Sequence, residues 1–119
     1  MIASVEGIVL GERLGINPKL LIEILSSSTS ANACLGGVYN PYPGINPSSP
    51  SSRNYKDGFQ TALMKKDIGL AVEAAEEEGL EVEFGRRAWG VYDKMDSLGH
   101  GSKDFGVFFQ YLSKKNEKK

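Results

Sequence analysis

The sequence predicts an all-α fold, and three observations carry this prediction. Apolar residues recur every three or four positions through most of the chain, which is the spacing of one face of a helix. Glycine, asparagine and proline separate these segments, at points where helices typically end and begin. The only strand-like run, residues 80–84, is short and lies between two predicted helices.

The first predicted helix starts at the beginning of the chain. No capping residue or turn precedes Met1, so we expect the chain to begin inside a longer helix. Gly7 and Gly11 lie one turn apart, and they either permit close approach of another helix or only destabilise this one mildly. The apolar residues of this segment are Ile2, Val5, Val9 and Leu10.

A second helix is predicted over residues 18–25 from its boundary residues. Gly15 suits the position after a helix, Asn17 suits an N-cap, and Pro18 suits a first helical turn. The residues expected to face inward are Leu20, Leu21, Ile24 and Leu25.

Two polar stretches follow this helix. Residues 26–32 are rich in Ser and Thr, so the helix ends there, and a further short helix near residues 31–35 is an alternative. Residues 36–57 form a long irregular stretch that holds every proline except Pro18. We expect an ordered loop, because an unstructured linker would not carry its apolar and aromatic residues Val38, Tyr39, Tyr42, Ile45 and Tyr55.

The rest of the chain predicts three more helices. The strongest pattern covers residues 58–78, and another covers residues 83–98. A turn with His100 between two glycines follows. The segment 102–104 then opens a last helix carrying Phe105, Phe108, Phe109 and Leu112.

The composition describes a single globular domain. The chain has 119 residues, of which 40% are hydrophobic and 24% charged, with 14 Lys+Arg against 15 Asp+Glu. This balance argues against a general nucleic-acid or membrane binder. We expect the basic tail, Lys114 to Lys119, to be a solvated chain end. Cys34 is the only cysteine, which favours a reducing compartment, and we find neither a membrane-spanning run nor a signal peptide.

Most catalytic signatures are missing from the sequence. It has no GxGxxG, P-loop, CxxC or HExxH pattern, and one His with one Cys argues against a zinc site. We interpret His100 as an exposed turn residue. The cluster from Ser26 to Ser30 is better explained by helix capping than by a nucleophile.

One pair of charges stands out on the helix predicted over residues 58–78. A helical wheel places Lys66 and Asp67 within an apolar stripe, whereas Lys65 points to the opposite side. Charges on a buried face are costly unless they are paired or needed. Lys66 is therefore a candidate for a cleft that binds phosphate or carboxylate, and the alternatives are a snorkelling side chain or a local ion pair. The stripe comprises Phe59, Leu63, Leu70, Ala71 and Ala74.

Motifs at this point of the sequence resemble those of the 3-hydroxyisobutyrate dehydrogenase family. The family typically reads YNPVPG, then VPSSNNY, then GF..ALM.KDLGLA. The matching residues here are Tyr39-Asn40-Pro41-Tyr42-Pro43-Gly44, Pro50-Ser51-Ser52-Arg53-Asn54-Tyr55, Gly58-Phe59 and Ala62-Leu63-Met64-Lys65-Lys66-Asp67-Ile68-Gly69-Leu70-Ala71. The segments 10–21 and 103–112 are also similar, so the resemblance covers nearly the whole chain in one order.

The resemblance implies a 6-phosphogluconate dehydrogenase-like helical C-terminal domain. Members of the family combine it with a Rossmann domain that binds NAD. They oxidise 3-hydroxyisobutyrate to methylmalonate semialdehyde in valine breakdown. By this resemblance, residues 1–119 start inside the inter-domain helix, and the Rossmann domain and the catalytic lysine belong upstream of Met1. We therefore expect no catalytic residue and no metal ligand in this chain, and no turnover by the chain alone.

The resemblance also assigns residues. Lys66 matches a lysine that contacts NAD, and Phe59 matches a phenylalanine near the nicotinamide. Asp67 is interpreted as a supporting partner. The segment 26–35 departs from the family pattern, with Ala33 or a neighbour where a tryptophan is usual.

The predicted function is thus the lid and dimerisation domain of an NAD-dependent 3-hydroxyisobutyrate dehydrogenase, and the alternative is a non-catalytic interaction module of the same superfamily. The expected partners are 3-hydroxyisobutyrate and a second copy of the chain in a homodimer or higher oligomer, with no nucleic acid and no membrane. The resemblance implies the mitochondrial matrix for a eukaryotic protein, and the cytoplasm otherwise.

Overall fold

A computed structural model describes residues 1–115, and these residues confirm the all-α prediction. No strand occurs within them, and their single β-bridge joins Gln60 to Asp104. The predicted basic tail lies largely outside this range, at residues 116–119. The elements are α1 (Ile2–Arg13), α2 (Pro18–Ser27), η1 (Pro50–Arg53), α3 (Thr61–Glu77), α4 (Glu83–Met95), η2 (Asp96–His100), η3 (Phe105–Val107) and α5 (Phe108–Lys115).

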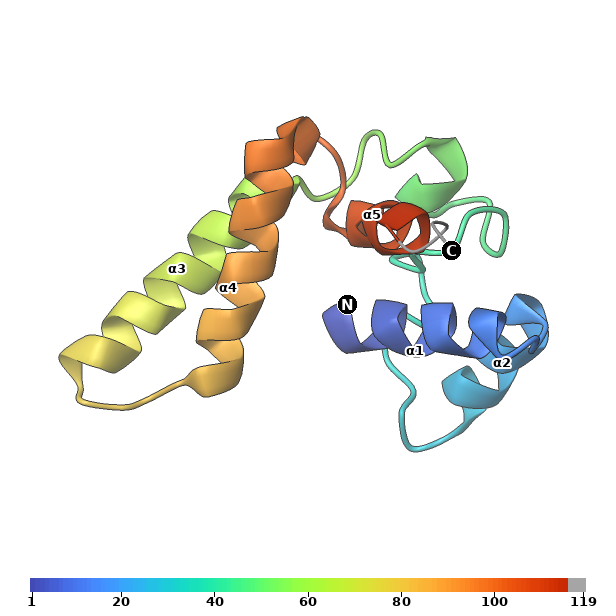
Figure 1. The fold of residues 1–119 in the computed structure, drawn as a ribbon, viewed down its shortest axis with the longest axis horizontal. Helices are drawn as coiled ribbons and strands as arrows, with labels where there is room; N and C mark the ends of the chain where they lie inside the picture. Colours follow the sequence, from blue (N-terminus) through green and yellow to red (C-terminus); the bar gives the residue numbers. More distant parts are fainter. Residues whose placement is uncertain (116–119) are drawn as a thin grey trace.

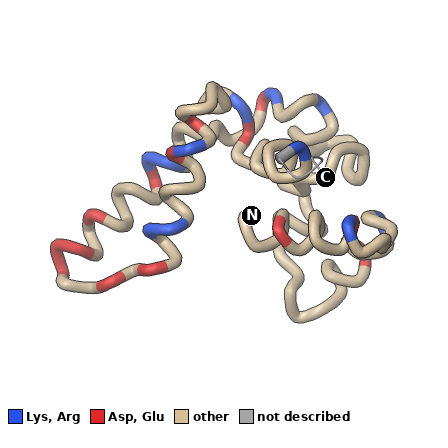
Figure 2. The backbone as a smooth tube through the Cα atoms, in the orientation of Figure 1, with Lys and Arg blue, Asp and Glu red and all other residues tan. Residues whose placement is uncertain are grey.

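The helices form two groups, as Figure 1 shows. The helices α3 and α4 make an antiparallel hairpin on one side, and α1, α2 and α5 pack with the long loop on the other. Gly79 allows the tight turn after α3, because its φ of 69° is a left-handed conformation that glycine adopts without strain. Acidic residues gather at this closed end of the hairpin (Figure 2), among them Glu76, Glu77, Glu78, Glu81 and Glu83.

The main core lies between α1 and α5. Val5 and Ile8 on α1 are fully buried, and they face Phe108 and Phe109 at the start of α5. Met95 at the end of α4 joins the same cluster, which ties the hairpin to the rest of the domain. The burial of these side chains supplies the main driving force for folding.

The start of α2 is as predicted. The Asn17 side chain accepts a hydrogen bond from the amide N–H of Leu20 at 3.2 Å, and Pro18 occupies the first turn. The predicted inward face is partly wrong, because Leu20 and Ile24 are half exposed while Ile22 is buried. The helices α1 and α2 meet instead at Gly11, where a Cβ would overlap Leu21.

The long loop is ordered, as predicted, and contains η1. The Tyr55 hydroxyl donates to the carbonyl of Pro41 at 2.9 Å, and the Ser51 hydroxyl donates to that of Asn40 at 2.6 Å. Residues 31–35 form turns and not a helix, with the Cys34 amide N–H donating to Asn32 Oδ1. The hydroxyls of the Ser26–Ser30 run bond mostly to carbonyls of the last turn of α2, so the capping interpretation holds there.

The bounds of α3 and α4 differ slightly from the prediction. The helix expected over residues 83–98 ends at Met95 and continues as a π-helical turn, η2, which contains His100. Phe59 precedes α3, because that helix begins at Thr61 and not at residue 58. None of the helices in residues 1–115 combines the length and the hydropathy of a membrane span, and the acidic, His and Cys side chains of the same residues form no group that could hold a metal ion.

Candidate functional site

The helix α3 has two different faces. One face packs on α4 and contains Thr61 and Val72, both buried. The opposite face carries Leu63 and Leu70, whose exposed fractions are 43% and 56%. The apolar stripe predicted to be buried is therefore an exposed face of this chain. The prediction was wrong because α3 is apolar on two sides, and α4 can cover only one of them.

Lys65 lies on the covered face and holds the hairpin together. Its ammonium lies 2.8 Å from a carboxylate oxygen of Asp93 and 3.1 Å from one of Asp96. Hydrogen bonds to Asp93 and then to Asp96 raise the pKa of Lys65 above its ordinary value. Lys65 does point away from the stripe, as predicted, but that side is the packed side.

Lys66 lies on the exposed face. Its side chain is 59% exposed, and its ammonium lies 2.8 Å from an oxygen of the adjacent Asp67. Of the alternatives considered for Lys66, the structure therefore shows the local ion pair. Lys66 also lines a groove of about 350 Å³ together with Leu70 and Trp89, and Lys65 with its partner Asp96 lines another side of the same groove. A cation at the rim of an uncovered apolar face can contact an anionic or hydroxyl-bearing ligand there.

Phe59 lies in the segment just before α3, which begins at Thr61 after the extended residue Gln60. Its carbonyl accepts a hydrogen bond from the amide N–H of Phe105 at 2.9 Å. The two rings meet edge to face, with centroids 6.1 Å apart. The Phe59 side chain is 37% exposed, so a held aromatic ring is available to a ligand.

Asp104 fixes this arrangement, and the sequence interpretation did not single it out. It is only 3% exposed, and its two carboxylate oxygens accept from the amide N–H groups of Phe59 at 3.0 Å and Gly106 at 2.9 Å. Burial raises the pKa of Asp104, although both backbone donors act to lower it. A Cβ at Gly58 would overlap this carboxylate. The sequence signal that could have identified Asp104 is its place directly after Lys103, in the segment 103–112 that resembles the family.

Comparisons with known proteins match this chain along nearly its full length. A family model described as "NAD-binding of NADP-dependent 3-hydroxyisobutyrate dehydrogenase" matches residues 1–112. Mitochondrial 3-hydroxyisobutyrate dehydrogenase of Rattus norvegicus is 44% identical over 112 residues, which are 94% of this chain and 33% of that protein. An NAD-dependent L-serine dehydrogenase of Pseudomonas aeruginosa is 39% identical over 107 residues, 90% of this chain and 36% of that protein.

A solved structure agrees with the sequence matches. The 3-hydroxyisobutyrate dehydrogenase of Mycobacterium tuberculosis, solved with L-serine, superposes with a TM-score of 0.85 at 35% identity. The match covers 93% of this chain and 38% of that one. The chain therefore spans about a third of the length of the relatives it matches.

Proposed function

Because the chain belongs to the 3-hydroxyisobutyrate dehydrogenase family, we propose that it serves as the helical NAD-binding and dimerisation domain of such an enzyme. The enzyme would oxidise 3-hydroxyisobutyrate to methylmalonate semialdehyde with NAD, a step of valine breakdown. The observation that carries this proposal is the exposed apolar face of α3, with Lys66 at its groove and Phe59 just before the helix.

The residues on this face fit part of a dinucleotide. The groove of about 350 Å³ is too small for all of NAD, so it would hold one portion of the cofactor. The Lys66 ammonium supplies three donors for a hydroxyl or anionic group, and Asp67 restrains it. Phe59 offers a ring for contact with the nicotinamide. The bound cofactor would supply the hydride acceptor of the reaction.

We assign no catalytic residue to these 119 residues. By family resemblance, the acid–base lysine and most contacts to NAD belong to other parts of the enzyme. We therefore expect the chain alone to bind NAD weakly and to show no turnover, since it lacks both the base and the proximity effect.

A second apolar surface supports self-association. Leu10 on α1 and Leu14 just after it are 60% and 70% exposed, and Leu20 and Ile24 on α2 are 51% and 53% exposed. Exposed apolar patches of this kind mark interaction sites. The same surface also suits the alternative function, a non-catalytic interaction module. The mitochondrial matrix is the proposed compartment for a eukaryotic protein, because the eukaryotic relatives are named mitochondrial, and the cytoplasm otherwise.

A chimera separates the two functions. Residues 1–112 would replace the matching third of the rat enzyme, and NADH formation would be measured with 3-hydroxyisobutyrate and with L-serine. The proposal predicts turnover with 3-hydroxyisobutyrate. A chimera that is folded by circular dichroism and dimeric by ultracentrifugation, yet inactive with both substrates, would favour the interaction module.

A further inference from the structure

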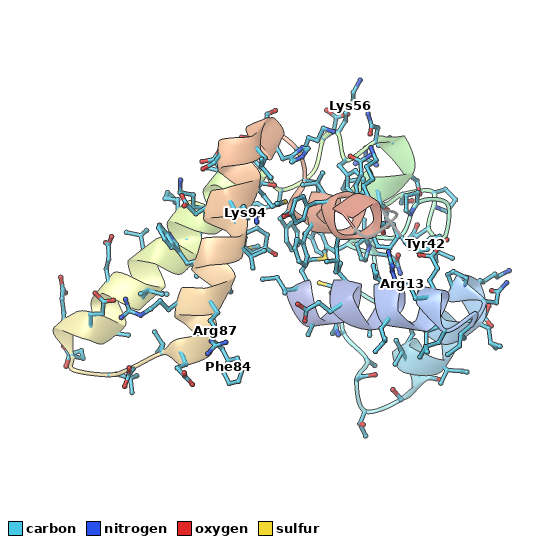
Figure 3. All side chains as sticks on the ribbon, in the orientation of Figure 1. Arg13, Tyr42, Lys56, Phe84, Arg87 and Lys94 are labelled. Atoms are coloured by element: carbon cyan, nitrogen blue, oxygen red, sulfur yellow. The ribbon has the colours of Figure 1, made fainter. Side chains whose placement is uncertain are left out.

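A small pocket lies between η2 and α5. It has a volume of about 350 Å³ and is lined by His100, Gln110, Tyr111 and Lys114. Lys94 on α4 also reaches α5, with its ammonium 5.5 Å from the centroid of the Tyr111 ring (Figure 3). This pocket shares no lining residue with the Lys66 groove.

The pocket gathers positive charge that the described residues do not neutralise. Lys94, Lys103 and Lys114 make no ion pair with the carboxylates of residues 1–115, whereas Lys65, Lys66, Arg53, Arg86 and Arg87 all do. Asp96, the acid in η2 itself, is engaged by Lys65, which also pairs with Asp93 on α4. Most of the other acidic residues of the hairpin cluster at its other end (Figure 2).

The pKa of His100 responds to these nearby positive charges. Burial lowers its pKa below the ordinary value, and the charges of Lys103 and Lys114 lower it further. Like charges gathered around a half-buried site disfavour each other unless an anion binds between them. An anion that raised the pKa of His100 would favour the imidazolium, in which both ring nitrogens are donors.

We propose that this pocket binds a phosphate group, either free or on a small phosphorylated metabolite. Lys114 supplies an ammonium, Gln110 an amide donor and His100 an imidazole N–H, while Lys94 and Lys103 add charge from the α4 and 101–104 sides. Lysine is a common phosphate ligand because its ammonium acts as a compact point charge. The inference does not depend on the proposed dehydrogenase function.

The single histidine of the chain makes the test direct. The imidazole proton resonances of His100 would be followed by NMR against pH, with inorganic phosphate, adenosine monophosphate or NaCl at equal ionic strength. We expect phosphate to raise the pKa of His100 saturably and NaCl to raise it less, without saturation. Tighter binding of adenosine monophosphate would identify a phosphorylated metabolite, and equal binding would identify free phosphate.

Variants assign the effect to the pocket. Lys114→Gln keeps the side-chain stem and should weaken phosphate binding about fivefold, the scale of one partly exposed charge contact. Lys103→Ala should act in the same direction, and each variant should raise the pKa of His100 before phosphate is added. Lys56→Ala, an exposed lysine outside the pocket, should change neither value. A His100 response that is unsaturable, or that survives both pocket variants unchanged, would overturn the proposal.

Discussion

Asp104 should be the most sensitive polar residue for stability, because it joins the segment before α3 to the start of η3. Asp104→Ala removes two charge-assisted hydrogen bonds, of 3.0 Å and 2.9 Å, and leaves the partly buried amide N–H of Phe59 and the buried amide N–H of Gly106 without acceptors. Each loss costs about 1.5–2 kcal/mol, so the free energy of unfolding should fall by about 3–4 kcal/mol. At about 4 °C per kcal/mol for a domain of this size, Tm should fall by roughly 12–16 °C.

Thermal unfolding followed by circular dichroism would measure this change. Asp104→Asn keeps one acceptor but turns an amide group toward the other donor, so we expect about half the loss. Asp57→Asn is the matched control, because its side chain is 86% exposed and its ion pair with Arg53 is long, at 4.0 Å. Equal Tm values for the two Asn variants would show that the Asp104 contacts do not hold these segments together.

Three further predictions follow from other parts of the structure. Gly7→Ala should raise the free energy of unfolding in urea by about 0.5–1 kcal/mol, because a Cβ there meets no atom within 4 Å and alanine favours helix. Burial raises the pKa of Tyr55 and Tyr92 above their ordinary value of 10.0. Their contribution to stability is therefore complete below pH 10 and lost as pH rises above it, which alkaline unfolding at several pH values would show. Lys65→Met should lower Tm more than Lys66→Met, because only Lys65 bridges α3 to Asp93 and Asp96, and equal Tm values would contradict this.

Local patterns predicted the helices well because their boundaries depend on nearby residues. Asn17 caps α2 with its own side chain, and Gly15 and Gly79 both take the left-handed conformation that ends a helix. The ordered loop was also predictable, since buried Tyr55 needs a fixed partner and finds it in the carbonyl of Pro41.

Contacts between distant segments were harder to predict. The helical period of α3 shows an apolar stripe, but it does not show whether α4 or solvent lies against that stripe. The stripe with Lys66 was therefore predicted to be buried although it is exposed, and the side with Lys65 is the one that packs on α4. The Asp104 contact with Phe59 spans 45 positions in the chain, and no periodic pattern indicates such a pair. The candidate residues Lys66 and Phe59 were therefore identified from the sequence, whereas Asp104, which holds the backbone of Phe59 in place, was not.

The Lys66→Ala substitution in the active rat chimera asks whether NAD binds at the exposed face of α3. We expect kcat/KM for NAD to fall by the equivalent of about 1–3 kcal/mol, the scale of a lost hydrogen bond to a charged group. Lys65→Ala should lower Tm and should lower kcat/KM for NAD less than Lys66→Ala does, at a temperature where the chimera is folded, because the Lys65 ammonium is already engaged by Asp93 and Asp96. If the two variants lose NAD turnover alike, or if Lys65→Ala loses more, then the exposed face of α3 is not where the cofactor binds.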